Sequence, residues 1–143
     1  MATVDVYEVL GGRKALGVPP PELSELRHLL EEGLPFPALE SLRDTLGLSR
    51  TEVLSSLGIT ARTLARRKRD KRLDPAESDR LFRLARITAL AMDVLEDPEV
   101  VRRWLHKPNR ALGGEVPLDL VATDIGARQV EEALIAIDHG IFA

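Results

Sequence analysis

Residues 49–73, SRTEVLSSLGITARTLARRKRDKRL, contain the start and stop signals of two short helices joined by a tight turn. Ser49 followed by Glu52 three residues later is a capping-box pattern, so a helix is expected to begin next to Ser49 and to end at Gly58. Thr60 can then cap a second helix, which contains most of the remaining residues of the stretch. Two helices joined by a short glycine-containing turn form the helix-turn-helix pattern.

The second helix carries the positive charge of a chain whose formal net charge is −3. Residues 62–73 hold seven of its twenty Lys and Arg residues, and only Asp70 among them is acidic. A charged helix face can be merely solvated, but a basic face directly after the turn favours DNA binding, because the second helix of this motif enters the major groove. The acidic total does not oppose this, since charges are screened beyond about 8 Å at physiological ionic strength.

We therefore expect operator DNA as a partner. The first turn of the basic helix should meet base edges and the rest should meet phosphates, with Arg66, Arg67 and Arg69 facing solvent. A homodimer is expected, because one helix-turn-helix unit contacts one half-site and a pair gains affinity by contacting two. The candidate DNA-binding residues are Thr60, Arg62, Thr63, Arg66, Arg67, Lys68, Arg69, Lys71 and Arg72.

Apolar periodicity and capping signals predict an all-α fold, in which the helix-turn-helix is joined by a long shared helix to a small C-terminal helical domain. The long helix from Pro75 is apolar on almost every side after its first turns, so neighbouring helices should cover it all round. The leucines of the first helix should share one buried face; they are Leu23, Leu26, Leu29 and Leu30. The expected helices lie at about 22–33, 37–47, 50–58, 61–71, 75–96, 98–108 and 123–140, with a helical turn from 117.

We expect three parts along the chain. Residues 1–20 show no sustained period, contain three glycines and end in consecutive prolines, which predicts an N-terminal arm or leader. Residues 21–80 should form the helix-turn-helix domain. Residues 81–143 should form the C-terminal domain, with the long helix belonging to both.

The composition excludes several kinds of site. There is no Cys, so neither disulfides nor thiolate metal sites can form. Hydrolase, phosphate-loop and zinc-protease motifs do not occur, and the three His residues lie far apart at 28, 106 and 139. There is no apolar run of membrane length and no signal-peptide pattern. We therefore expect a cytoplasmic protein that is not an enzyme, with no cofactor, metal or membrane partner.

The C-terminal segment, residues 104–143, reads WLHKPNRALGGEVPLDLVATDIGARQVEEALIAIDHGIFA. Together with TARTLARRK at 60–68 and RLDPAESDRLFRLARI at 72–87, it resembles the Xre/MbcA/ParS antitoxins, which combine a Xre/Cro-like helix-turn-helix with a C-terminal toxin-binding domain. The likeness covers about residues 46–143. The matching motif residues are Trp104, Leu105, Pro108, Asn109, Leu112, Gly113, Gly114, Pro117, Leu118, Thr123 and Gly126.

The resemblance implies a type II antitoxin encoded beside a RES-domain toxin that consumes NAD⁺. Such an antitoxin binds the toxin, obstructs the toxin's active-site entrance with its C-terminal end, and represses its own operon as part of the complex. Most motif residues should be structural, and Trp104 in particular should anchor the core. The alternative is a stand-alone transcriptional regulator whose C-terminal domain dimerises or senses a small ligand.

Exposed groups of the C-terminal loop and the chain end are the candidate toxin contacts. The tail could instead pack back on Val130 and Leu134, and in that case Glu131 and Glu132 become the next candidates. The candidate toxin-binding residues are Asn109, Arg110, Leu112, Gly113, Gly140, Ile141, Phe142 and Ala143.

Overall fold

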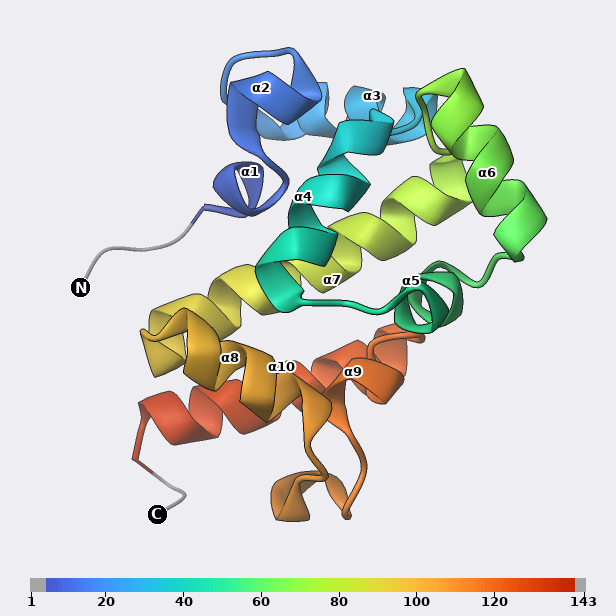
Figure 1. The fold of residues 1–143 in the computed structure, drawn as a ribbon. Helices are drawn as coiled ribbons and strands as arrows, with labels where there is room; N and C mark the ends of the chain where they lie inside the picture. The colour runs from blue at the N-terminus through green and yellow to red at the C-terminus, as the bar shows by residue number, and fades with distance from the viewer. Residues whose placement is uncertain (1–4, 141–143) are drawn as a thin grey trace.

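The computed structural model describes residues 5–140 of the chain, and within that range it consists of helices joined by loops, with no β-sheet (Figure 1). This confirms the all-α prediction. The elements are α1 (Val6–Val9), α2 (Gly12–Leu16), α3 (Leu23–Glu32), α4 (Phe36–Leu46), α5 (Arg50–Leu57), α6 (Ala61–Asp70), α7 (Pro75–Leu95), α8 (Pro98–His106), the 3₁₀ turn η1 (Arg110–Leu112), α9 (Pro117–Leu120) and α10 (Asp124–Asp138).

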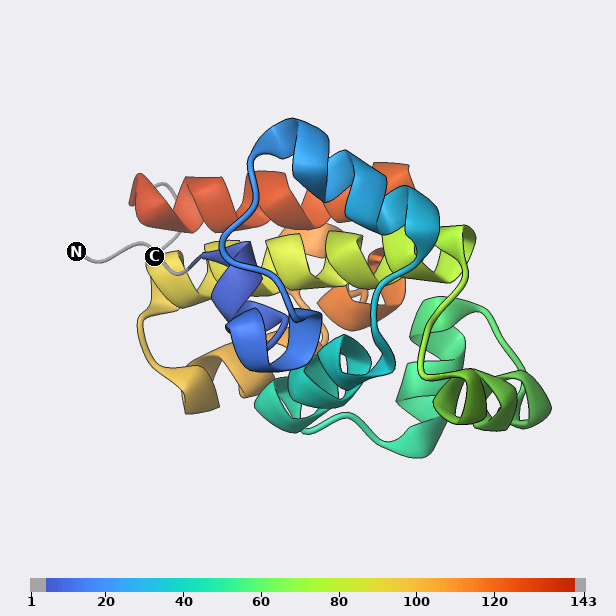
Figure 2. The same cartoon turned by 90° about the horizontal axis from the view of Figure 1, so that it is seen from above.

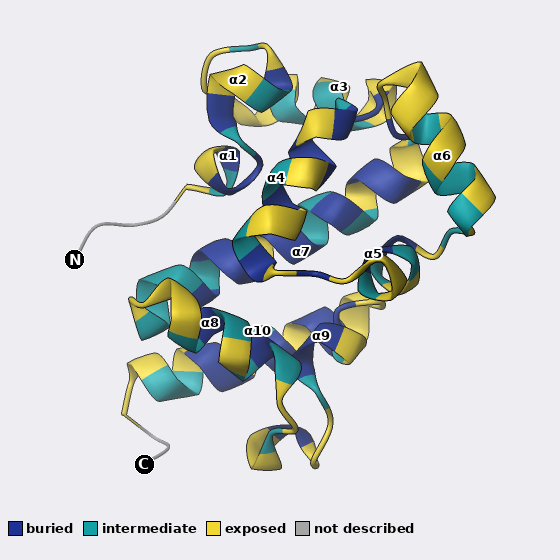
Figure 3. Ribbon diagram, in the orientation of Figure 1, coloured by how far each residue is buried: buried dark blue, intermediate teal, exposed yellow. Residues whose placement is uncertain are grey.

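The long helix α7 forms the centre of the molecule. Asp74 caps it by accepting a hydrogen bond from the amide of Glu77 at 2.7 Å, and Pro75 occupies the first helical position, as the sequence predicted. Helices α1, α3, α5, α8 and α10 pack around α7 (Figures 1 and 2). They cover its apolar surface, and one hydrophobic core extends from Tyr7 to Leu134 (Figure 3).

Helices α5 and α6 form the predicted helix-turn-helix. The amide of Glu52 donates to Ser49 Oγ at 3.1 Å, and the amide of Ser49 donates to Glu52 Oε1 at 2.8 Å, which completes the capping box. Gly58 ends α5 with a φ of 65°, a conformation that glycine adopts more easily than other residues. Thr60 caps α6 by accepting a hydrogen bond from the amide of Thr63 at 3.2 Å.

The N-terminal segment differs from the expected arm. Its described residues form the short helices α1 and α2, and Tyr7, Leu10 and Leu16 belong to the hydrophobic core. The Tyr7 hydroxyl donates to the carbonyl of Val18 at 2.7 Å, which ties the start of this segment to its end. Helices of four and five residues are too short to produce a sustained apolar period, so the sequence pattern did not reveal them.

Helix α3 is less buried than its leucine pattern predicts. None of its residues is fully buried, and Leu23 is 84% exposed. Leu29 and Leu30 pack against the core only in part. The leucine face is therefore not buried along its whole length, and Leu23, in the first turn of α3, is the most exposed of the four.

The C-terminal helices are joined to the helix-turn-helix half by polar contacts as well as by the shared core. Arg102 of α8 donates from Nε to the carbonyl of Thr45, at the end of α4, at 2.7 Å. His106 of α8 has Nε2 3.0 Å from a carboxylate oxygen of Glu52 on α5. Helix α8 therefore contacts two helices of the helix-turn-helix half directly.

Helix α10 begins at a close approach to the end of α9. Thr123 caps it by accepting a hydrogen bond from the amide of Gly126 at 3.0 Å. A Cβ at Gly126 would overlap the carbonyl oxygen of Leu120, so only glycine fits there. The Thr-x-x-Gly motif thus has a structural role, in setting how α10 leaves the turn.

Candidate nucleic-acid interface and C-terminal surface

One face of α6 presents three arginines to solvent. Arg62, Arg66 and Arg69 are exposed, and spacings of four and three residues place them on one side of the helix. Within residues 5–140, no acidic side chain forms an ion pair with any of them. We call these three residues the arginine face. Its charge is not neutralised internally, and Lys68 and Lys71 are exposed close to it.

The first turn of α6 is organised by its threonines. The Thr60 hydroxyl accepts a hydrogen bond from the amide of Thr63 and lies 3.2 Å from the Thr63 hydroxyl. Both side chains therefore serve the helix start, although Thr60 remains exposed. Arg62 is the long exposed side chain of this turn, in the part of a recognition helix from which base edges are reached.

Arg67 does not face solvent, which corrects the prediction made for it from the sequence. Its side chain is only 17% exposed and points toward the start of α7. Nε donates to Glu77 Oε1 at 2.7 Å, and Nη2 donates to Asp74 Oδ2 at 3.2 Å. The hydrogen bond to Glu77 raises the pKa of Arg67 above its ordinary value, so the side chain remains a cation. Arg67 thus joins two helices, with its Nε and Nη2 donors engaged by the carboxylates of Glu77 and Asp74.

Arg72 is also engaged within the protein. One of its terminal nitrogens donates to the carbonyl of Gly33 at 2.6 Å, and the amide of Leu73 donates to the carbonyl of Leu34 at 2.9 Å. These bonds fasten the end of α6 to the loop between α3 and α4. Because Arg72 remains partly exposed, it can still add positive charge at this end of the helix.

Two basic residues outside α6 were missed by the sequence reasoning. Arg43 of α4 and Arg50 of α5 line a cleft of about 250 Å³ together with Lys68 of α6, and Glu40 lies on the same cleft. The cleft brings three positive charges together where α4, α5 and α6 meet. Helices α4 and α5 each contain one basic residue, Arg43 and Arg50. A single basic residue in a helix is no recognisable sequence pattern, and the two meet Lys68 only when the three helices pack together.

The C-terminal loop is held in place by its own backbone. The amide of Asn109 donates to the carbonyl of Glu115 at 3.0 Å, and Asn109 Oδ1 accepts from the amide of Ala111 at 2.9 Å. Leu112 is 8% exposed and belongs to the hydrophobic core. The candidate toxin contacts that the loop leaves exposed are therefore Arg110 and Gly113, while Asn109 and Leu112 hold its shape.

The other candidates near the chain end are placed unequally. Gly140 is exposed, and the predicted contacts Ile141, Phe142 and Ala143 lie outside the described residues. Glu131 pairs with Arg86 of α7 at 2.9 Å, whereas Glu132 is exposed. Trp104 is partly buried against the core, which agrees with the anchoring role expected for it.

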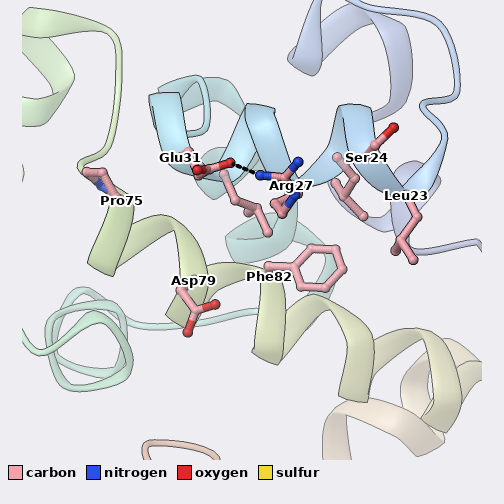
Figure 4. Close-up of a pocket in the computed structure, with 9 residues that line it drawn as sticks. Leu23, Ser24, Arg27, Glu31, Pro75, Asp79 and Phe82 are labelled. Carbon is pink, nitrogen blue, oxygen red and sulfur yellow. Dashed lines mark hydrogen bonds and ion pairs between the residues drawn. The ribbon is translucent and has the colours of Figure 1, made fainter.

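An apolar groove of about 730 Å³ lies between α3 and the first half of α7 (Figure 4). Phe82 and Leu30 contribute to its walls, and at its rim Arg27 donates to Glu31 at 2.9 Å. The groove belongs to the helix-turn-helix half of the chain. It therefore gives no support to a C-terminal domain that senses a small ligand.

Residues 5–140 contain neither a metal-binding cluster nor a membrane-spanning helix. The side chains there include no group of three or more His, Asp and Glu residues arranged to hold a metal ion. No helix of this part of the chain is both long and apolar enough to cross a membrane.

The fold and the arginine face define a helix-turn-helix protein with a second helical unit packed along the same central helix. Comparison with protein-family models agrees with both halves. Residues 25–86 match the antitoxin Xre-like helix-turn-helix domain. Residues 90–140 match the antitoxin Xre/MbcA/ParS C-terminal toxin-binding domain. The chain belongs to this antitoxin family, which confirms the resemblance seen in its motifs.

Individual relatives support the same assignment. The chain is 28% identical over 132 residues to Antitoxin Xre of Yersinia enterocolitica, an alignment that covers 91% of this chain and 89% of that protein. It is 45% identical over 83 residues to Antitoxin Xre of Pseudomonas putida, covering 57% of this chain and 52% of that protein. It is 27% identical over 125 residues to the Prs ADP-ribosylating antitoxin of a Sphingobium species, covering 80% and 79%.

Proposed function

We propose that this chain is the antitoxin of a type II toxin–antitoxin pair, which binds and neutralises a toxin encoded beside it and binds operator DNA to regulate the pair. The toxin is a RES-domain protein that consumes NAD⁺. The observation that carries the proposal is the junction of two regions: one matches a toxin-binding domain, and the other is a helix-turn-helix whose arginine face has no acidic partner within residues 5–140. Neutralisation requires binding alone, so the chain needs no catalytic group or cofactor of its own, and it acts in the cytoplasm, where NAD⁺ and the operator are found.

DNA binding rests on the arginine face, supplemented by the basic cleft. Arg62 reaches base edges, Arg66 and Arg69 meet phosphates, and Lys68 and Arg50 extend the contact along the backbone. Arginine suits both tasks, because its planar fork binds a guanine edge or a phosphate through two hydrogen bonds. Two chains in a homodimer place two such helices on neighbouring half-sites.

The chemistry of the toxin can be measured in the same experiment as its neutralisation. The reading frame beside the gene is expressed alone and together with this chain, and growth, cellular NAD⁺ and ADP-ribosylated proteins are followed. The expected result is arrested growth with falling NAD⁺, reversed by co-expression. Loss of NAD⁺ without labelled protein indicates consumption of NAD⁺ alone, whereas labelled protein indicates ADP-ribosyl transfer, the chemistry in the name of the Sphingobium relative.

A second measurement tests DNA binding separately. The purified chain is titrated onto its own promoter and onto a scrambled duplex of the same composition, at two salt concentrations. Specific retention of the promoter supports autoregulation. A chain that binds the promoter but whose neighbouring reading frame neither arrests growth nor binds it is instead the stand-alone regulator.

A further inference from the structure

We propose that the outward face of α10, formed by Ile125, Arg128, Glu132 and Ile135, is a docking surface for the toxin. This inference rests on the proposed function and names the surface through which it acts. We call these four residues the α10 face. Of the four, only Glu132 was named from the sequence, as a candidate for the case in which the tail packs on its own domain.

The α10 face carries most of the exposed large hydrophobic side chains in the described residues. Three such side chains occur there: Leu23 on α3, and Ile125 and Ile135 on α10, which are 68% and 45% exposed. Helical geometry places the two isoleucines about 80° apart around the axis and about 15 Å apart along it. They therefore form a stripe on one side of a single helix, with Arg128 and Glu132 between them.

The opposite side of α10 already supplies everything the domain needs for its core. Ala127, Val130 and Leu134 are fully buried there, and Gly126 fits against the end of α9. The exposed isoleucines add nothing to this packing. Because an isoleucine that stays exposed gains less hydrophobic free energy from folding than a buried one, two of them on one side of a helix form an apolar stripe that can bury further surface in a complex.

The charges beside the isoleucines argue against DNA as the partner. The exposed side of α10 and its ends carry Asp124, Glu132 and Asp138 against Arg128, and Arg128 lies 4.0 Å from Asp124. Together these four charged side chains carry a net charge of −2, which disfavours contact with phosphate. The face fits a protein with an apolar groove bordered by Lys or Arg.

The position of α10 identifies that protein as the toxin. The whole α10 face lies within residues 90–140, which match the toxin-binding domain. Helix α10 is followed closely by Gly140, the first residue of the predicted contact segment at the chain end. Helix α10 runs along α7 at the edge of the molecule, away from α6 (Figures 1 and 2). One surface can thus hold the toxin while the arginine face holds DNA.

The test uses the full-length chain and the product of the adjacent reading frame, purified with a substitution that abolishes its toxicity. Affinity is measured by calorimetry for the parent, for Ile125→Glu with Ile135→Glu, and for Leu23→Glu. The control places the same change at an exposed leucine outside the toxin-binding domain. We expect the double variant to lose at least about a hundredfold in affinity, roughly tenfold per anchor, with unchanged melting temperature and promoter binding, and the control to bind like the parent.

The outcomes separate the two proposals. If the parent binds the toxin and the double variant binds equally well, the α10 face is not the docking surface, and the proposed function stands. If the parent does not bind the product of the adjacent frame, the proposed function fails and this inference fails with it. Should the double variant melt early, the truncations Ile125→Ala and Ile135→Ala replace it; undiminished affinity in both overturns the inference, and a loss in either supports it.

Discussion

The guanidinium of Arg67 on α6 is held by the carboxylate of Glu77 on α7, with Nε 2.7 Å from Oε1 and Nη2 3.1 Å from Oε2. Glu77 Oε1 also accepts the amide of Asp74, so one carboxylate caps α7 and fixes α6. The Glu77 side chain is only 4% exposed. Arg67 points into the protein and holds α6 against α7. It thereby helps to orient the arginine face, which lies on the opposite side of α6.

Replacing Arg67 with Ala should destabilise the protein while removing no DNA contact. The change leaves the carboxylate of Glu77 buried without its main partner, and breaking a buried ion pair in this way costs about 3 to 5 kcal/mol. The free energy of unfolding from urea denaturation measures the loss. Arg67→Lys should recover only part of it, because an ammonium group cannot make the two-point contact.

Arg66→Ala is the matched control, since it removes the same side chain one residue away on the exposed side. Its unfolding free energy should stay within about 0.5 kcal/mol of the parent, as expected of a surface change. Its affinity for the promoter should fall. Equal stability of the two alanine variants would contradict the structural role assigned to Arg67.

The arginine face should determine how strongly DNA binding depends on salt. Each phosphate contact that is lost reduces the slope of log affinity against log salt concentration by about 0.9. Replacing Arg62, Arg66 and Arg69 together with Ala should therefore flatten it by about 1.8, because Arg66 and Arg69 meet phosphates and Arg62 meets base edges. Titrations at four or five salt concentrations give the slope. Replacing the same three residues with Lys should keep most of the slope while weakening the preference for the promoter, because lysine is a poorer reader of base edges. If the alanine variant keeps both affinity and slope, the face is merely solvated.

The parts of this fold that the sequence predicts well are those fixed by neighbouring residues. Ser49 with Glu52, and Asp74 with Glu77, are capping boxes whose partners lie three residues apart, and both helices begin where these pairs place them. The apolar pattern of α7 likewise predicts that it is covered on most sides. These patterns can be recognised in the sequence without knowing which helices pack together.

What the sequence does not reveal depends on contacts between distant segments. Arg67 belongs to a run of basic residues, and its inward direction follows from the angle at which α6 crosses the start of α7. The cleft that gathers Arg43, Arg50 and Lys68 exists only after α4, α5 and α6 have packed. The exposure of Ile125 and Ile135 is equally hidden, because an isoleucine in a helical pattern is normally assigned to the core.

Gly126→Ala should destabilise the C-terminal unit. The added methyl group overlaps the carbonyl oxygen of Leu120, so α10 or the end of α9 must shift, at a cost of about 1 to 3 kcal/mol. The melting curve followed by circular dichroism reports the effect. Gln129→Ala, at an exposed position of the same helix, should melt like the parent. A Gly126→Ala protein as stable as this control would show that the close approach can relax without cost.

Removing residues 140–143 should leave a folded protein that binds DNA and no longer neutralises the toxin. Only Gly140 of this segment lies within the described residues, where it is exposed after the end of α10. The physical reason is that the truncation removes two large apolar side chains, Ile141 and Phe142. In the full-length chain these are expected to enter the toxin rather than the core of their own chain. Melting temperature, promoter affinity and protection of growth are measured on the same truncated protein.

The alternative to this prediction is that the tail packs on Val130 and Leu134. In that case the truncation should melt early, because uncovering apolar side chains costs about 1.5 to 3 kcal/mol for each one that was buried. Replacing Ile141 and Phe142 with Ser, at full chain length, separates loss of apolar contact from loss of chain length. A truncation that melts like the parent and still protects cells would rule out both roles for the tail. The toxin contact would then fall to the α10 face, where Glu132 is exposed and free of the pairing that occupies Glu131.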